Sequence, residues 1–274
     1  MKKITTGMNL DRLGVVMAMT MLAFSLTWII PVSADKQSFT ILGFQIGLTL
    51  NLKTLISVIT ALMAAVGCDW FVRSHPKFYD NQAKGLLGYQ HIIAPVFLAF
   101  VISVTLNQAL TGIYWWIVFA LGGILFSLIL IAEYTIIDNR SEDHPLAAMG
   151  LVGLTFALFL IMSIATRSLQ IRLYLEVIIC LISSAMVATR MFFIRLKGQL
   201  PVFWTLVVSL VMAQIAAGLH YVVLQPIKIG LILTGILYAM VSLICGVVEK
   251  KERFSLFFEP FAMIFLIVII SIFV

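Results

Sequence analysis

Residues 113–132 read IYWWIVFALGGILFSLILIA, a run that contains no charged side chain. An α-helix rises about 1.5 Å per residue, so about 20 apolar residues cross the roughly 30 Å hydrocarbon core of a bilayer. Trp115 and Trp116 stand at one end of this run, where amphipathic rings favour the membrane–water interface. The stretch therefore predicts a membrane-spanning helix.

The rest of the chain is similarly apolar. It has 274 residues, of which 62% are hydrophobic and 11% are charged, with a mean hydropathy of +1.11. A soluble fold has about 25% charged residues, so a soluble enzyme is excluded. The same length criterion predicts an all-α, polytopic transmembrane bundle that forms a single integral membrane domain over residues 1–274. Its nine expected spans are Leu13 to Ile30, Leu52 to Phe71, Ile92 to Leu106, Ile113 to Ala132, Leu146 to Ala165, Leu173 to Phe193, Val202 to Val222, Ile227 to Val248 and Phe261 to Val274.

The positions of the basic residues predict the orientation. With a cytoplasmic N-terminus, thirteen of the 18 Lys and Arg lie on the inner side, and five lie outside: Lys36, Lys53, Arg167, Arg172 and Lys228. The positive-inside rule then favours a plasma-membrane protein with its N-terminus in the cytoplasm and its C-terminus outside. The net charge of +6 is not gathered in one stripe, so no nucleic-acid partner is expected.

The first span admits two interpretations. Val32-Ser33-Ala34 follows it and is similar to the small-residue cleavage site of a secretory signal. The apolar run of residues 13–30 is longer than the roughly 7 to 15 residues usual for a signal, which favours a retained anchor over a cleaved one.

Two loops carry patterns of their own. In residues 37–51, Phe44, Ile46, Leu48 and Leu50 alternate with polar or small residues, which predicts an outer β-hairpin with one apolar face. We expect this hairpin to cap the helix ends, with a contact to a partner or to lipid as the alternative. Residues 74–90 mix basic and aromatic side chains, which is typical of a short interfacial helix.

Ionisable groups inside a membrane are costly and mark functional candidates. In this chain they gather at the inner helix ends. Glu133 stands out, because no cation lies within one turn of it on its own helix, and its partner must come from Arg73, His91 or Arg190. The candidate inner-face polar cluster is Asp69, Arg73, His75, His91, Glu133 and Arg190.

The alternative interpretation of these charges is structural. Three acid–base pairs are spaced i,i+4 on one helix face and can neutralise each other. They are Asp69 with Arg73, Arg172 with Glu176, and Glu249 with Arg253. Convergence of Arg73, His75, Glu133 and Arg190 would instead indicate a pocket for a phosphate.

Neither a metal nor a cofactor is expected. The His, Asp and Glu residues have no metal-ligand spacing. Cys68, Cys180 and Cys245 lie inside spans without a C-x-x-C motif, so we expect buried packing residues. His220, at an outer helix end, is expected to be an interfacial residue.

Four short motifs resemble a bacterial family of polytopic integral membrane proteins of unknown function. They are Gly67-Cys68-Asp69-Trp70-Phe71-Val72-Arg73-Ser74-His75-Pro76, then Ala132-Glu133-Tyr134, then Gln225-Pro226 followed by Gly230, Gly235 and Tyr238, and finally Glu259. The family pattern has a tyrosine after this last glutamate, where this chain has Pro260. The resemblance implies a fold and a topology and leaves the mechanism open.

Three functions follow as hypotheses. The first is a non-catalytic accessory or scaffold subunit of a membrane complex, with the bilayer and a membrane protein as partners. The second is a transporter or lipid carrier, for which Gly122-Gly123 and Gly218 offer possible helix breaks and Gln214 a polar mid-span group. The third is a membrane enzyme acting on a lipid-linked phosphate at the cytoplasmic face. The absence of a catalytic motif disfavours an enzyme.

Overall fold

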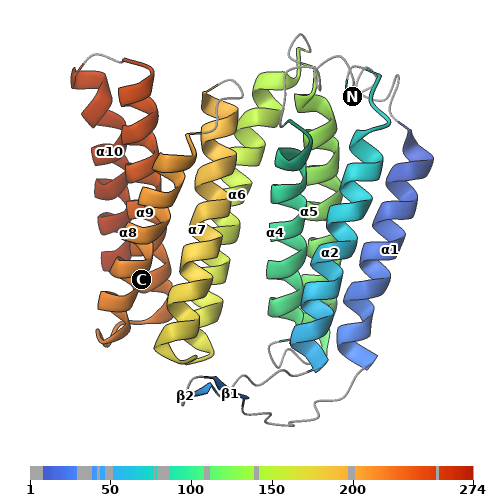
Figure 1. Ribbon diagram of the computed structural model, residues 1–274, viewed down its shortest axis with the longest axis horizontal. Coiled ribbons are helices and arrows are strands. Elements are labelled where there is room, and N and C mark those ends of the chain that lie inside the picture. Colours follow the sequence, from blue (N-terminus) through green and yellow to red (C-terminus); the bar gives the residue numbers. More distant parts are fainter. Residues whose placement is uncertain are drawn as a thin grey trace. The chain divides into compact units, whose positions relative to one another are not determined.

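The computed structural model describes residues 9–29, 39–41, 44–46, 52–76, 78, 87–107, 112–138, 142–196, 201–250 and 253–273. These residues form nine helices and one small ribbon of two strands (Figure 1). The helices are α1 (Leu10–Ile29), α2 (Leu52–Val72), α4 (Leu87–Asn107), α5 (Ile113–Ile136), α6 (His144–Ser168), α7 (Leu173–Arg195), α8 (Val202–His220), α9 (Pro226–Val248) and α10 (Arg253–Phe273).

Eight of the described helices are long and apolar enough to cross a membrane: α1, α2, α4, α5, α6, α7, α8 and α9. Helix α10 contains a shorter apolar stretch, Phe257–Ile267. The chain is therefore built as a multi-pass membrane protein, and the prediction of a polytopic helical chain is confirmed at this level.

Two predicted span boundaries are wrong. The third helix begins at Leu87 rather than at Ile92, because Gln90 and His91 are buried inside the protein and so remain in the helix. The last helix begins at Arg253, so Pro260 lies inside α10 and not in its first turn. A membrane helix tolerates an internal proline when its neighbours satisfy the freed backbone groups.

The two strands are β1 (Phe39–Ile41) and β2 (Phe44–Ile46). They pair antiparallel, with Phe39 opposite Ile46 and Ile41 opposite Phe44. The remainder of the expected hairpin over residues 37–51 lies outside the described residues, as do the strand side chains, so its apolar face stays a prediction. Most of the expected interfacial helix over residues 74–90 also lies outside them.

The chain divides into two compact units, whereas we expected a single domain from the sequence. Unit 1 covers Met1–His144 and unit 2 covers Pro145–Val274. Hydrophobicity shows where helices lie but not which helices contact each other, so this division is not visible in the sequence.

Unit 1 contains α1, α2, α4 and α5, which pack side by side (Figure 1). Glycines allow close approach. A Cβ added at Gly67 would meet Val16 of α1 at 2.7 Å, and one at Gly122 would meet Ile102 of α4 at 2.7 Å. A Cβ at Gly123 would meet Met21 of α1, also at 2.7 Å. Since α5 continues unbroken from Ile113 to Ile136, Gly122 and Gly123 serve helix packing rather than a helix break.

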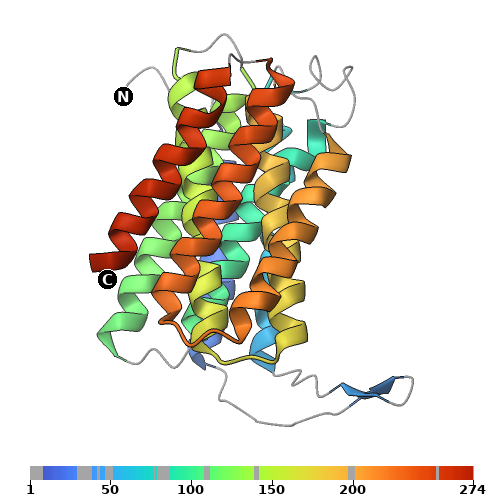
Figure 2. The same cartoon turned by 90° about the vertical axis from the view of Figure 1, so that its left-hand side faces the viewer.

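Unit 2 contains the helices from α6 to α10. Helix α10 runs alongside α9 (Figure 2), and a Cβ added at Gly235 of α9 would clash with Ile267 of α10. At Gly230 of α9, an added Cβ would meet Ile164 of α6 at 2.7 Å. Both close contacts depend on the missing side chain, so these glycines set the spacing of α9 from its neighbours.

Tryptophans lie near helix ends, as the interface preference predicts. Trp28, Trp70, Trp116 and Trp204 are exposed, but Trp115 is only 2% exposed. Its ring centroid lies 5.1 Å from that of Trp28 and 5.0 Å from that of Phe119. Trp115 is thus a packing residue of unit 1, and its depth at the membrane interface stays a prediction.

Candidate functional site

The central contact of the predicted cluster joins His91 of α4 to Glu133 of α5. Nδ1 of His91 lies 2.8 Å from Oε2 of Glu133. The His91 side chain is 6% exposed and the Glu133 side chain is fully buried. Glu133 therefore takes its partner from another helix, as predicted, and His91 is that partner.

Helix α2 meets the same pair. The Cys68 thiol donates to the backbone carbonyl of His91 at 3.3 Å, and both residues are buried. Three helices of unit 1, α2, α4 and α5, therefore meet at His91. In a bilayer, such interhelical bonds replace the hydrophobic driving force that would hold helices together in water.

Two further predicted residues, Asp69 and Arg73, form an ion pair at the end of α2. Nε of Arg73 lies 2.7 Å from Oδ2 of Asp69, which confirms this i,i+4 pair. Both side chains are accessible, at 51% for Arg73 and 29% for Asp69. Such an exposed pair stabilises the helix only modestly.

His75 lies just beyond α2 and is 8% exposed. Its ring packs edge-on against Tyr134 of α5, with 4.5 Å between the ring centroids. Tyr134 also contacts Phe71, at 5.2 Å between centroids. The imidazole of His75 therefore takes part in an aromatic contact between the end of α2 and α5.

Arg190 belongs to α7 of unit 2, whereas the other five predicted residues belong to unit 1. It is fully buried, and its guanidinium carbon lies 5.6 Å from the ring centroid of Phe193 on the same helix.

Arg12, a basic residue outside the predicted cluster, also contacts α2. Arg12 of α1 donates from Nη1 to the backbone carbonyl of Trp70 at 3.2 Å. Its guanidinium carbon also lies 4.9 Å from the Trp70 ring centroid. The two residues lie 58 positions apart, so no local pattern in the sequence pairs them.

Unit 2 contains a polar network that the cluster prediction missed. Nη2 of Arg195, at the end of α7, lies 2.9 and 2.7 Å from the two carboxylate oxygens of Glu259 in α10. The Tyr238 hydroxyl of α9 donates to Oε1 of Glu259 at 2.8 Å, and Nη1 of Arg195 donates to the Ser242 hydroxyl at 3.1 Å. Tyr238 and Glu259 both occur in the motifs that suggested a family, which was the signal available.

At the other end of α7, Glu176 does not make the expected pair with Arg172 among the described contacts. Its Oε2 atom lies 2.5 Å from Nδ1 of His220 in α8 and 3.9 Å from Nη1 of Arg167 in α6. His220 thus contacts the carboxylate of Glu176 on another helix, and its place at the membrane interface stays a prediction. The third predicted pair, Glu249 with Arg253, stays a prediction because the Arg253 side chain lies outside the described part of the chain.

The three cysteines are free thiols and all are buried, as predicted. Among the described residues, no three His, Cys, Asp or Glu side chains gather in a way that could hold a metal ion. The polar contacts described above are hydrogen bonds and ion pairs.

Long apolar helices joined by buried polar contacts define the class of this chain, an integral, multi-pass membrane protein. Residues 32–274 match the family model described as "Protein of unknown function (DUF5656)", and the chain belongs to this family. No curated protein and no solved structure matches it.

Proposed function

We propose that this protein is a non-catalytic accessory or scaffold subunit of a membrane complex. The observation that carries the proposal is the 2.8 Å contact between His91 and Glu133. Glu133 is the acid that the sequence marks as the strongest functional candidate, and it is engaged in a bond between α4 and α5. A residue in this position contributes to the architecture of the bundle.

The energetics favour the same role. Removing one partner of a buried, hydrogen-bonded polar pair costs about 1–3 kcal/mol, because the other group is left unsatisfied in a medium of low polarity. Asp69 with Arg73 and Arg195 with Glu259 are also mutually compensated. The contacts of His91 with Glu133 and of Arg195 with Glu259 each join two helices, and such a bundle is suited to present a fixed surface within the membrane.

One such surface lies along α5. Ile113, Ile117, Leu121, Ile124 and Leu128 follow each other at helical spacing and are each 47–66% exposed. In a bilayer this face contacts either lipid tails or a helix of another protein. A membrane-protein partner is the occupant that the scaffold proposal requires.

In this proposal the protein lies in the plasma membrane with its N-terminus in the cytoplasm and its C-terminus outside. The support is the distribution of Lys and Arg, thirteen inside and five outside. Cysteine accessibility in a cysteine-free background tests it, with single cysteines introduced at Glu142 and at Val223. Both positions are exposed: Glu142 lies just before the start of α6, and Val223 lies just after the end of α8. In the proposed topology Glu142 is inside and Val223 is outside. An impermeant maleimide should therefore label a cysteine at Val223 in intact cells and spare one at Glu142.

Purification of the tagged full-length protein in a mild detergent tests the scaffold role. We expect a second membrane protein to co-purify in a fixed ratio. A photo-crosslinking residue at Leu121 should give a protein adduct, whereas one at Phe24, which is buried, should give none. Recovery of the protein alone and monomeric, with lipid adducts only at Leu121, would contradict the proposal.

A further inference from the structure

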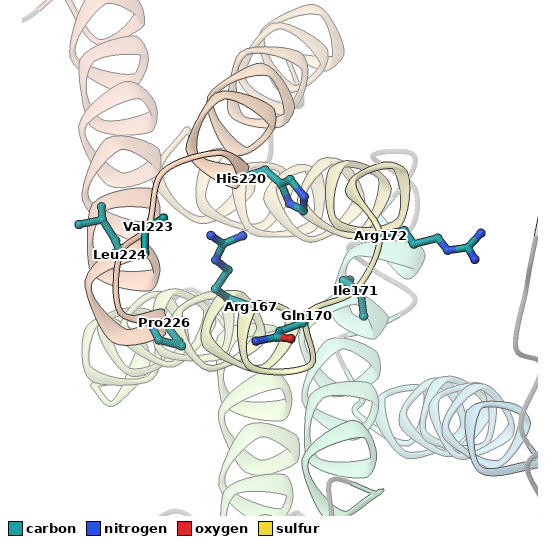
Figure 3. A pocket seen from close by; sticks show the side chains of 8 residues that line it. All are labelled: Arg167, Gln170, Ile171, Arg172, His220, Val223, Leu224 and Pro226. Atoms are coloured by element: carbon teal, nitrogen blue, oxygen red, sulfur yellow. The ribbon is translucent and has the colours of Figure 1, made fainter.

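A pocket of about 550 Å³ lies at one end of unit 2 (Figure 3). It is bordered by the end of α6, the start of α7, the end of α8 and the start of α9. Its polar lining comes from Arg167, Gln170, Arg172 and His220. None of these residues belongs to the cluster predicted from the sequence.

Arg167 is held in place within this pocket. Its Nη2 atom donates to the backbone carbonyl of Val222 at 3.0 Å, and its Nη1 atom lies 3.9 Å from Oε2 of Glu176. Figure 3 shows the guanidinium of Arg167 pointing into the pocket, with the ring of His220 facing it from α8. A guanidinium carries five N–H donors, so Arg167 can bind an oxyanion while it keeps both contacts.

The charge around the pocket is predominantly positive. Arg167 and Arg172 line it, and Lys228 lies in the first turn of α9. The acid at this site, Glu176, is already bound to His220. The surplus of positive charge favours an anion.

Two helix N-termini add to this field. Helices α7 and α9 both begin at the pocket, and neither has a side chain that caps its first turn. An uncapped N-terminus presents backbone N–H groups and a partial positive charge, which together favour a phosphate. Donors from several directions suit a tetrahedral group with several acceptor oxygens better than a planar carboxylate.

The apolar part of the lining indicates where the rest of a ligand would lie. Ile171, Val223 and Pro226 border the pocket, and Val223 is 98% exposed. Ile171 and Val223 lie in the connections that follow α6 and α8, and Pro226 is the first residue of α9. In the proposed topology these connections lie outside the membrane-spanning segments, where lipid headgroups are found. The pocket thus offers both cationic and apolar contacts.

Gln170 has an unusual backbone conformation at this site. Its φ is +46°, in the left-handed region that glycine or asparagine usually occupies after a helix. A glutamine there is strained, because its Cβ crowds the backbone in this region. The conformation places its amide, a further donor, at the rim of the pocket (Figure 3).

We propose that this pocket binds an anionic phosphate group, presented either by a membrane lipid or by free phosphate. Arg167 is its main ligand, and His220 and the N-termini of α7 and α9 are the supporting donors. The site is independent of the scaffold role, since it lies at residues that the α5 surface does not include.

Affinity measurements on the full-length protein in a neutral detergent test this proposal. The probes are short-chain phosphatidylglycerol, the matching phosphatidylcholine and inorganic phosphate. We expect phosphatidylglycerol to bind at least about tenfold more tightly than phosphatidylcholine. If inorganic phosphate competes for the site at similar concentrations, the ligand is free phosphate; if it does not, the ligand is a lipid. Equal affinity for the two lipids, with no binding of phosphate, would overturn the proposal.

Two variants locate the site. Arg167→Gln should weaken the binding of the preferred probe about tenfold, because a charge-assisted hydrogen bond is lost. Arg73→Gln, which removes one positive charge from unit 1, is the matched control and should change the affinity less than twofold. Arg167→Lys keeps the charge but loses the forked geometry, and it should give an intermediate loss even if Arg167→Gln does not fold. Unchanged affinity in the folded Arg167 variants would contradict the assignment.

Discussion

Oε2 of Glu133 lies 2.8 Å from Nδ1 of His91, and this contact bridges 42 positions of the chain. It joins α5 to α4 at a point where the Cys68 thiol of α2 also bonds to the His91 carbonyl. One histidine therefore connects three helices of unit 1. Two of the polar residues that stand out in the sequence, His91 and Glu133, thus form a link between helices.

The close approach of α5 and α4 at Gly122 leads to a first prediction. In Gly122→Ala, the new Cβ would meet Cγ2 of Ile102 at 2.7 Å, so either the Ile102 side chain or one of the helices must shift. We expect a loss of about 1–3 kcal/mol of stability, measured by unfolding in detergent.

A matched control and a rescue accompany this variant. Gly153→Ala places a methyl group where nothing lies within 4 Å, so it should leave stability unchanged or raise it by about 0.5–1 kcal/mol. Ile102→Ala should reduce the additional cost of Gly122→Ala. Equal effects of the two glycine substitutions would contradict the packing role of Gly122.

The contact of Arg195 with Glu259 leads to a second prediction, on the attachment of α10. Glu259→Gln removes the carboxylate that receives both Nη2 contacts of Arg195 and the Tyr238 hydroxyl. We expect a loss of about 1–2 kcal/mol, and Tyr238→Phe should cost about 1 kcal/mol. Hydrogen exchange should accelerate in α10 and remain unchanged in α1.

Glu142→Gln is the control for this prediction, since Glu142 is exposed and belongs to the segment before α6. It also removes one negative charge, but it should leave the rate of hydrogen exchange in α10 unchanged. If Glu259→Gln also leaves α10 unaffected, the network does not hold this helix.

The two neighbouring tryptophans of α5 are predicted to contribute differently to the stability of the protein. Trp115 is 2% exposed and Trp116 is 54% exposed. Trp115→Ala should lower stability by about 3–5 kcal/mol, because it leaves a cavity against Trp28 and Phe119. Trp116→Ala should cost much less. Thermal unfolding of both variants in the same detergent distinguishes them, and a larger effect at Trp116 would be inconsistent with the packing described here.

The burial of the cysteines predicts their reactivity. Cys68, Cys180 and Cys245 are free and buried, so a maleimide should label none of them in the folded protein. Addition of a denaturing detergent should release three reactive thiols per chain. Rapid labelling of the native protein would show that at least one of these helix contacts opens readily.

The sequence was sufficient to predict the helices but not their neighbours. Length and hydrophobicity determine where a chain crosses a bilayer, so most expected spans agree with the helices to within a few residues. The boundary at His91 was misplaced because a polar residue at a span end looks like a loop unless its partner is known. The division into two units likewise depends on contacts between helices, which no hydropathy pattern records.

The polar contacts show the same limit. Asp69 and Arg73 were paired correctly because both lie on one helix, four residues apart. Glu176 was paired with the wrong residue because its actual partner, His220, lies 44 positions away on α8. For Glu133 the sequence reduced the choice to three residues, since the absence of a cation on its own helix required a partner from another one.

A double-mutant cycle on His91 and Glu133 tests the central claim most directly. His91→Gln, Glu133→Gln and the double variant are unfolded in the same detergent, and their stabilities are compared with that of the unchanged protein. The account predicts that each single substitution destabilises the protein by about 1–3 kcal/mol and that the double variant loses clearly less than the sum. Full stability of Glu133→Gln, together with loss of the protein's cellular role, would contradict the structural assignment and indicate a functional site instead.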